Sequence, residues 1–316
     1  MNPKRVNWLF LAAILYESIF IVGYSLVNYY YNIQLDVINS LLVSQSFMLI
    51  PIIIFLFIWE PKFWNFVPIK PLKILTSILI FLITLLCVPP IMAINAFSMI
   101  FVENAAYELS NELLGLPIWV SILVVGIIGP VLEEFAFRGV FFHGYKRSGR
   151  VVASALLSAF LFGLMHLNFN QMSYAFFVGI VCAFLVDVTG SLLAPIIFHC
   201  TINTGSVILS LLNGTNTNIS QEQVQAEFEK MAGMNYEKGL LITAVTMLGI
   251  SIFSMAIASG VFFLIIQIEG KTQYFQQIKE KALISKNAKL VSIPLVIAVA
   301  LCFIYMTASL ALSNMT

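Results

Sequence analysis

The stretch that decides the fold is PIWVSILVVGIIGPVLEEFAFRGVFFH, residues 117–143, an apolar run that carries Glu133, Glu134 and Arg138. A helix needs about 20 predominantly apolar residues to cross the hydrocarbon core of a bilayer. Ionisable residues at that depth are costly and are usually paired or functional. The stretch therefore predicts a transmembrane helix built around a polar site.

The composition extends this interpretation to the whole chain. Of the 316 residues, 60% are hydrophobic and 10% are charged, and the mean hydropathy is +0.97. Soluble domains have roughly 45–50% apolar and 25% charged residues, so a soluble fold is excluded. We predict an all-α fold, a polytopic membrane helix bundle of about nine transmembrane helices that forms a single membrane domain. The expected spans are residues 7–30, 41–59, 73–100, 117–145, 151–168, 171–188, 191–212, 239–268 and 290–312.

Basic residues predict the orientation, because Lys and Arg collect on the cytoplasmic side of a membrane. With a cytoplasmic N-terminus, only Lys230 and Lys238 fall outside, and Arg138 lies within a span. We therefore expect the N-terminus in the cytoplasm and the C-terminus outside. A composition rich in Asn, Ile and Lys suggests a bacterial cell membrane. The thirteen inner bases are Lys4, Arg5, Lys62, Lys70, Lys73, Lys146, Arg147, Arg150, Lys271, Lys279, Lys281, Lys286 and Lys289.

The segments between the spans add two weaker expectations. The outer polar stretch 213–238 contains glycosylation sequons at Asn213 and Asn218, which arise easily in an Asn-rich loop. The basic stretch 271–289 is either a helix on the inner membrane surface or a solvated loop. A net charge of +1 with no basic arm gives no indication of nucleic-acid binding. Four scattered cysteines do not form a disulfide framework.

Helical spacing divides the charges of the fourth span into two groups. Glu134 and Arg138 stand at i and i+4, so they are neighbours on one helix face and can form a buried pair. Glu133 points about 100° away and remains free for chemistry.

Two further spans carry polar residues at every fourth position, so each set lies on one helix face. Both faces should turn to the bundle interior, because lipid offers them no hydrogen-bond partner. The glycines and the proline before Glu133 would admit another backbone or break the helix locally. The first set is Ser154, Ser158, Phe162 and His166, and the second set is Ser191, Pro195, His199 and Asn203. The small residues before Glu133 are Gly126, Gly129 and Pro130.

These residue types suit peptide hydrolysis, which needs an activated water, a proton donor for the leaving amine and donors for the oxyanion. A desolvated carboxylate is a suitable base, His can transfer a proton or bind a metal, and Asn is a neutral donor. The sequence has no Gly-x-Ser-x-Gly, His-Glu-x-x-His or phosphate-binding loop. Serine-hydrolase, zincin and nucleotide-hydrolase interpretations therefore have no support.

The ordered motifs resemble those of the CAAX-protease and bacteriocin-processing (CPBP) family of intramembrane proteases. They are Glu133-Glu134-x-x-x-Arg138, Phe162-x-x-x-His166 and His199-x-x-x-Asn203. Each motif alone is weak, but their order on successive predicted spans is specific. The resemblance covers residues 117–212, which we expect to form the catalytic core.

The resemblance implies a role for each matched residue. Glu133 and His166 would activate the attacking water, and His199 and Asn203 would stabilise the oxyanion. Glu134 and Arg138 would be a supporting pair, although a purely structural role is an equal alternative. The family is also described as metal-dependent, so His166 and His199 are candidate ligands for a zinc-like ion. A metal-bound water and a glutamate-activated water remain alternatives.

The leading hypothesis is an intramembrane endopeptidase acting on a hydrophobic or membrane-associated peptide or membrane protein in the lipid bilayer. CAAX-tail processing, bacteriocin processing and signal-peptide maturation are possible reactions. The alternatives are a non-catalytic bacteriocin-immunity or scaffold protein that keeps the motifs as structure, and a small transporter that uses the charges as an ion relay.

Overall fold

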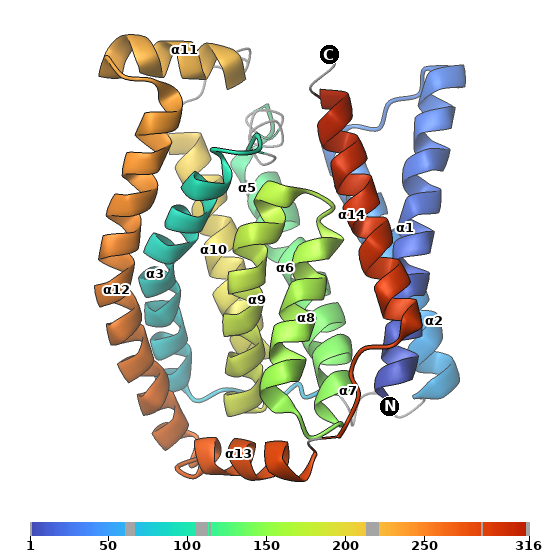
Figure 1. Cartoon of the computed structure of the whole chain (residues 1–316), viewed down its shortest axis with the longest axis vertical. Helices are drawn as coiled ribbons and strands as arrows, with labels where there is room; N and C mark the ends of the chain where they lie inside the picture. The colour runs from blue at the N-terminus through green and yellow to red at the C-terminus, as the bar shows by residue number, and fades with distance from the viewer. Residues whose placement is uncertain are drawn as a thin grey trace.

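The computed structural model describes residues 2–60, 67–104, 113, 115–212, 221–285 and 287–313, and none of these lies in a β-strand. Most of them form long helices that run along one axis (Figure 1). The predicted helical membrane bundle is therefore confirmed. The principal helices are α1 (Pro3–Tyr31), α2 (Val37–Trp59), α3 (Ile74–Ser98), α8 (Val151–Met165), α9 (Phe169–Thr189), α10 (Leu193–Leu212), α11 (Gln221–Ala232), α12 (Tyr236–Ile268), α13 (Tyr274–Ile284) and α14 (Ile293–Ser313).

The fourth crossing, Ile118–Lys146, is one helix made of short segments with different hydrogen-bond patterns. Two of its segments, η2 (Ile122–Ile128) and η3 (Phe135–Phe142), are π-helical. Such π-helical turns are rare and often occur at functional sites. The α-helical segments are α5 (Ile118–Ser121), α6 (Gly129–Glu134) and α7 (His143–Lys146).

Eight of the nine predicted spans are long and apolar enough to cross a membrane. The exception is α8, whose 15 residues extend only about 22 Å. It ends early because Leu167 adopts a left-handed conformation with φ of 51°. Asn168 then caps α9 by accepting hydrogen bonds from the backbone N–H groups of Asn170 and Gln171. The predicted span 151–168 is therefore a shorter apolar helix.

The two ends of the bundle differ. The chain begins at the end that α13 crosses, whereas α11 crosses the opposite end, where α14 finishes (Figure 1). An odd number of crossings, as predicted, gives this arrangement. Of the two alternatives for residues 271–289, a helix or a loop, the structure has a helix, α13. Which end faces the cytoplasm stays a prediction. Lys62, Lys286 and both sequons lie outside the described residues.

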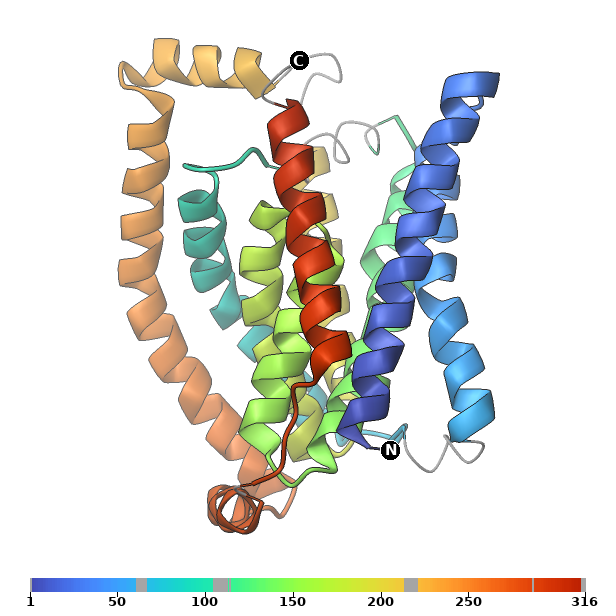
Figure 2. The ribbon, with the colours of Figure 1, turned by 45° about the vertical axis from the view of Figure 1, so that its right-hand side comes forward.

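The core of the bundle lies around α8, α9 and η3. Gly179 of α9 packs so closely on α8 that a Cβ atom would lie 2.8 Å from the Ala159 Cα atom. Close backbone approach of this kind lets membrane helices associate by van der Waals packing. The α1–α2 pair and α12 lie on opposite sides of this core (Figure 2).

Polar contacts around Asp187 connect α13, and the turn before it, to the core of the bundle. The Asp187 carboxylate of α9 forms an ion pair with Lys146 and accepts a hydrogen bond of 2.7 Å from the Tyr274 hydroxyl. Lys271 donates to the Asp187 carbonyl at 2.8 Å. Burial lowers the pKa of Lys271, and burial beside the Asp187 carboxylate raises the pKa of Tyr274 above its usual range.

Candidate active site

The fourth crossing contains an unusual backbone arrangement just before its charged residues. The Gly129 N–H donates to the Val124 carbonyl, five residues back, in the π-helical pattern. The same pattern would require Pro130 to donate to Val125, but proline has no N–H. The Asn203 side-chain amide of α10 instead donates to the Val125 carbonyl at 3.2 Å. Because Pro130 has no N–H to donate, the Val125 carbonyl oxygen is left to accept the hydrogen bond from Asn203.

Gly126 allows α10 to approach this irregular segment. A Cβ atom at Gly126 would lie 2.6 Å from Thr204 Oγ1 and 3.3 Å from its Cα atom. Real Cβ atoms essentially never come as close as 2.6 Å to another atom, so the Thr204 side chain or α10 itself would have to shift. The prediction that Gly126 admits a neighbouring backbone is confirmed.

Glu134 and Arg138 form the predicted pair. Arg138 Nη1 donates to Glu134 Oε1 at 2.7 Å, and both side chains are 0% exposed. The guanidinium also lies over the Phe162 ring, 4.4 Å from its centroid. The same Glu134 oxygen lies 2.8 Å from His199 Nδ1. Glu134 therefore connects the guanidinium to His199.

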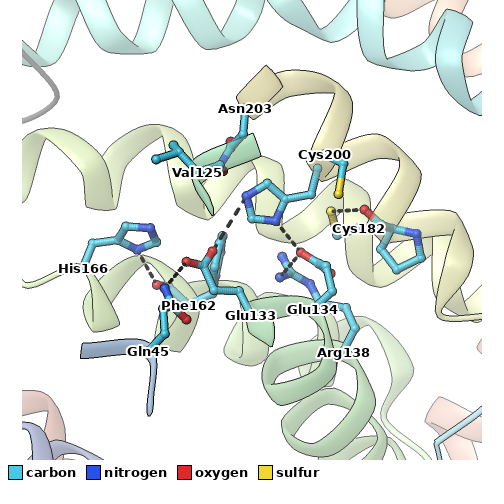
Figure 3. Close-up of polar contacts among 12 residues, drawn as sticks. Gln45, Val125, Glu133, Glu134, Arg138, Phe162, His166, Cys182, Cys200 and Asn203 are labelled. Carbon is cyan, nitrogen blue, oxygen red and sulfur yellow. Dashed lines mark hydrogen bonds and ion pairs between the residues drawn. The ribbon is translucent and has the colours of Figure 1, made fainter. Parts of the chain in front are cut away.

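This contact determines how His199 faces the rest of the site. An ionised carboxylate only accepts hydrogen bonds, so His199 Nδ1 carries the hydrogen toward Glu134. Nε2 then points toward Glu133, whose Oε2 is 3.8 Å away. That distance is too long for a direct hydrogen bond, so the two groups face each other across a small gap. Figure 3 shows Glu133 beside this gap, with Gln45 on one side and Glu134 on the other.

Glu133 is held from a second side by α2. Its Oε1 accepts a hydrogen bond of 3.0 Å from the Gln45 side-chain amide. The Glu133 side chain is 17% exposed, in contrast to the fully buried Glu134. Glu133 is thus the accessible carboxylate of the two. The sequence did not predict the Gln45 contact, because one amide in an apolar run gives no signal of its partner.

His166 lies at the end of α8, where its Nδ1 is 2.9 Å from the Phe162 carbonyl oxygen. The Phe162 ring stands edge-to-face to both histidine rings, at 5.0 Å from His166 and 5.7 Å from His199. Phe162 therefore packs against both histidines as a wall. Among the described residues, no hydrogen bond or ion pair joins His166 to Glu133, but both line one cavity.

The cavity has a volume of about 1340 Å³, larger than the roughly 300–1,000 Å³ of typical small-molecule sites. Its walls include residues of α1, α2, α3, α9, α10 and α14 together with Glu133, His166, His199 and Asn203. The described lining includes residues of the first turn of α2 and the last turn of α10, and these ends of the two helices lie at the end of the bundle away from the N-terminus (Figure 1).

The other half of the fourth crossing is closed. Five large side chains of this half, between Glu133 and the α13 end of the helix, are 0–1% exposed. These residues are Phe137, Arg138, Phe141, Phe142 and Tyr145. Among the described residues, the cavity thus lies toward one end of the bundle, and buried side chains fill the fourth crossing toward the other.

The predicted metal ligands do not form a complete metal site. Among the residues that the structure describes, no group of three or more His, Cys, Asp or Glu side chains converges. Catalytic zinc sites use three protein ligands and an open position. Nδ1 of His166 and Nδ1 of His199 face a carbonyl and a carboxylate, so each ring could offer only Nε2 to a metal, and two nitrogens do not complete a three-ligand site. The described side chains therefore do not supply the three ligands that a zinc-like ion needs.

Comparisons with known proteins point to the same segment. Residues 115–205 match the model of the Rce1-like type II CAAX prenyl endopeptidase family. The chain is 35% identical over 100 residues to the membrane-embedded CAAX protease MroQ of Staphylococcus aureus (strain USA300), which covers 30% of this chain and 40% of MroQ. It is 32% identical over 90 residues to YdiL of Bacillus subtilis (strain 168), named as a candidate membrane peptidase, covering 28% of this chain and 37% of YdiL. The chain thus matches less than half the length of these relatives, and no solved structure matches it.

Proposed function

We propose that this chain, whose residues 115–205 match the Rce1-like family model, is an intramembrane endopeptidase of the CPBP type. One observation carries the proposal. Glu133 and His199 face each other in a cavity inside the bundle, with a buried Arg138 and Glu134 pair holding the histidine. A base, an oriented imidazole and space for a peptide are the parts that hydrolysis needs.

In the proposed reaction, Glu133 is the general base. Its carboxylate takes a proton from a water molecule while the water oxygen attacks the carbonyl carbon of the peptide. The carboxylic acid that forms then gives this proton to the leaving amine as the C–N bond breaks. The Gln45 amide orients the carboxylate. His166, on the wall of the same cavity, assists in positioning the water.

His199 and Asn203 are the proposed oxyanion donors. With Nδ1 facing Glu134, Nε2 of His199 points into the cavity, and in the proposed reaction a protonated His199 donates its Nε2–H to the oxyanion. Asn203 uses one N–H to bind the Val125 carbonyl and keeps the other for the substrate. Preorganised donors of this kind typically contribute about 10²–10³ in rate.

The substrate that suits this cavity is a hydrophobic or membrane-associated peptide. Apolar side chains such as Phe20, Met48 and Val178 line much of the wall. With the N-terminus in the cytoplasm, as the basic residues predict, the end of the bundle toward which the cavity lies faces outside. We therefore favour a peptide that enters from the outer side, as in bacteriocin or signal-peptide maturation, over a cytoplasmic CAAX tail.

The test is cleavage of an apolar peptide library by purified protein in detergent or liposomes, with products identified by mass spectrometry. Glu133→Gln and His166→Ala should each lower kcat by at least about 10²-fold, since general acid–base groups contribute roughly 10²–10⁴. The exposed Glu237→Gln, which makes the same charge change outside the cavity, is the matched control. Full activity in both active-site variants would refute the proposal.

The same assay tests the metal question. We expect a chelator that strips zinc to leave the cleavage rate unchanged, because the described side chains do not form a three-ligand site. Metal content measured on the same sample provides the control. Loss of activity on chelation, with recovery on adding zinc, would contradict the glutamate-base mechanism.

A further inference from the structure

A second carboxylate, outside the residues 115–205 that match the family model, also faces the cavity. Glu17 of α1 lines the same cavity as Glu133, and its side chain is only 7% exposed. Its Oε1 accepts a hydrogen bond of 2.9 Å from the Ser44 hydroxyl of α2. Its Oε2 is buried and has no hydrogen-bond partner among the described residues. Leaving a buried polar atom unpaired costs about 1–3 kcal/mol, so its retention calls for an explanation.

The α2 helix places the two carboxylates in one site. Ser44 holds Glu17, and the next residue, Gln45, holds Glu133. A single extended peptide, at about 3.3–3.6 Å per residue, therefore reaches from one carboxylate to the other within a few residues. A group that binds Glu17 would lie close to a peptide bond at Glu133.

The charge of the cavity determines what that group should be. The described lining contains the acids Glu17 and Glu133 but no Lys or Arg. Arg138, the nearby buried cation, is already paired with Glu134. A buried carboxylate is stabilised strongly by an opposite charge that also donates hydrogen bonds. The two histidines of the described lining, His166 and His199, face Phe162, Glu134 and Glu133 rather than Glu17, so a bound molecule would supply the charge that Glu17 lacks.

We propose that Glu17 is a specificity-determining residue that binds a Lys or Arg side chain of the peptide substrate, near the bond that is cleaved. This assignment rests on the proposed protease function. The long aliphatic stem of either side chain packs on apolar surface while its charged end reaches a polar partner. Phe20, Ile21 and Met48 provide such a surface beside Glu17. The substrate class is therefore an apolar peptide with one basic residue.

Cleavage of matched peptides tests the assignment. An apolar library carries Lys, norleucine or Glu at one varied position, so that Lys and norleucine differ mainly in charge. We expect the natural protein to prefer Lys, and Glu17→Gln to reduce this preference roughly 10- to 100-fold. Glu17→Asp should keep much of it, and Glu237→Gln should keep all of it. Equal preferences in the natural protein and Glu17→Gln would overturn the proposal.

A binding measurement separates failure of this assignment from failure of the protease function. The Glu133→Gln variant, which should not cleave, is titrated with a fluorescent Lys peptide and its norleucine counterpart, with and without Glu17→Gln. Tighter binding of the Lys peptide that disappears with Glu17→Gln supports the subsite even if no peptide is ever cleaved. An unchanged preference for Lys, or no preference at all, refutes it. Thermal unfolding of each variant confirms that it is folded.

Discussion

The fourth crossing and the α1–α2 pair are both apolar helices beside one cavity, but they use their polar residues differently. In the fourth crossing, Glu134 and Arg138 are fully buried and bind each other and His199. In the α1–α2 pair, Glu17 and Gln45 line the cavity, and Gln45 donates a hydrogen bond to Glu133. The fourth crossing thus supplies the carboxylates of the proposed site. The α1–α2 pair holds one of them, Glu133, and in our proposal also selects the peptide that binds beside it.

The largest effect should come from breaking the buried pair of the core. Glu134→Ala leaves Arg138 as an unpaired charge among buried side chains, so we expect a loss of about 3–5 kcal/mol in the free energy of unfolding. Thermal or denaturant unfolding in detergent measures it. Glu17→Ala in the α1–α2 pair is the comparison, and it should cost far less because no cation is left behind. Equal losses would remove the distinction between the two regions.

A smaller effect should follow from filling the close contact at Gly126. Gly126→Ala places a Cβ atom 2.6 Å from Thr204 Oγ1, and such overpacking typically costs about 1–3 kcal/mol. Activity should fall as well, because a shift of α10 moves His199 and Asn203. Gly249→Ala is the matched control, since a Cβ atom there meets nothing within 4 Å. A stable and fully active Gly126→Ala variant would contradict the packing argument.

Gln45 sharpens the comparison, because it acts on the core from the α1–α2 pair. Gln45→Leu removes the hydrogen bond to Glu133. We expect kcat to fall about tenfold, which corresponds to about 1.4 kcal/mol of activation free energy, and the free energy of unfolding to change little. Partial recovery in Gln45→Asn would identify orientation of the carboxylate as the cause. Gln267→Leu, at an exposed position, controls for the change of residue type. An unaltered kcat would mean that Glu133 needs no support from α2.

The smallest effect should appear at α13. Tyr274→Phe removes one hydrogen bond to Asp187, whose pairing with Lys146 remains, so we expect a stability loss of about 1 kcal/mol and unchanged kcat. Tyr30→Phe, at a largely exposed position, is the control for loss of a hydroxyl. A strong loss of activity in Tyr274→Phe would show that α13 acts on the site rather than only on the fold.

Much of this organisation could be predicted from the sequence, since the lipid environment imposes simple rules. Apolar runs of sufficient length predicted the helices, and i, i+4 spacing predicted the contact between Glu134 and Arg138. The shortness of α8 was not predicted, because the left-handed Leu167 that ends it leaves no mark in hydropathy. The predicted catalytic roles of Glu133, His166, His199 and Asn203 remain to be tested.

The contacts that escaped prediction all join residues far apart in the chain. Gln45 and Glu133 are 88 positions apart, and Tyr274 and Asp187 are 87 apart. A lone polar residue in an apolar helix indicates that it needs a partner, but not which helix supplies one. Asn203 shows the same limit. Its spacing predicted an inward side chain, whereas its bond to Val125 depends on the missing N–H of Pro130.

The tightly packed aromatic residues below Glu133 have a consequence for the cell as a whole. Hydrolysis inside a bilayer requires wetting of the interior, yet an energised membrane stores work in its proton gradient and voltage, worth about 2.3 kcal/mol per charge at 100 mV. A water column that passed through the bundle would dissipate this stored work. Phe137, Phe141, Phe142 and Tyr145 are almost completely buried on one side of the site. We therefore expect water to reach Glu133 from the cavity without a continuous water column along this half of the fourth crossing.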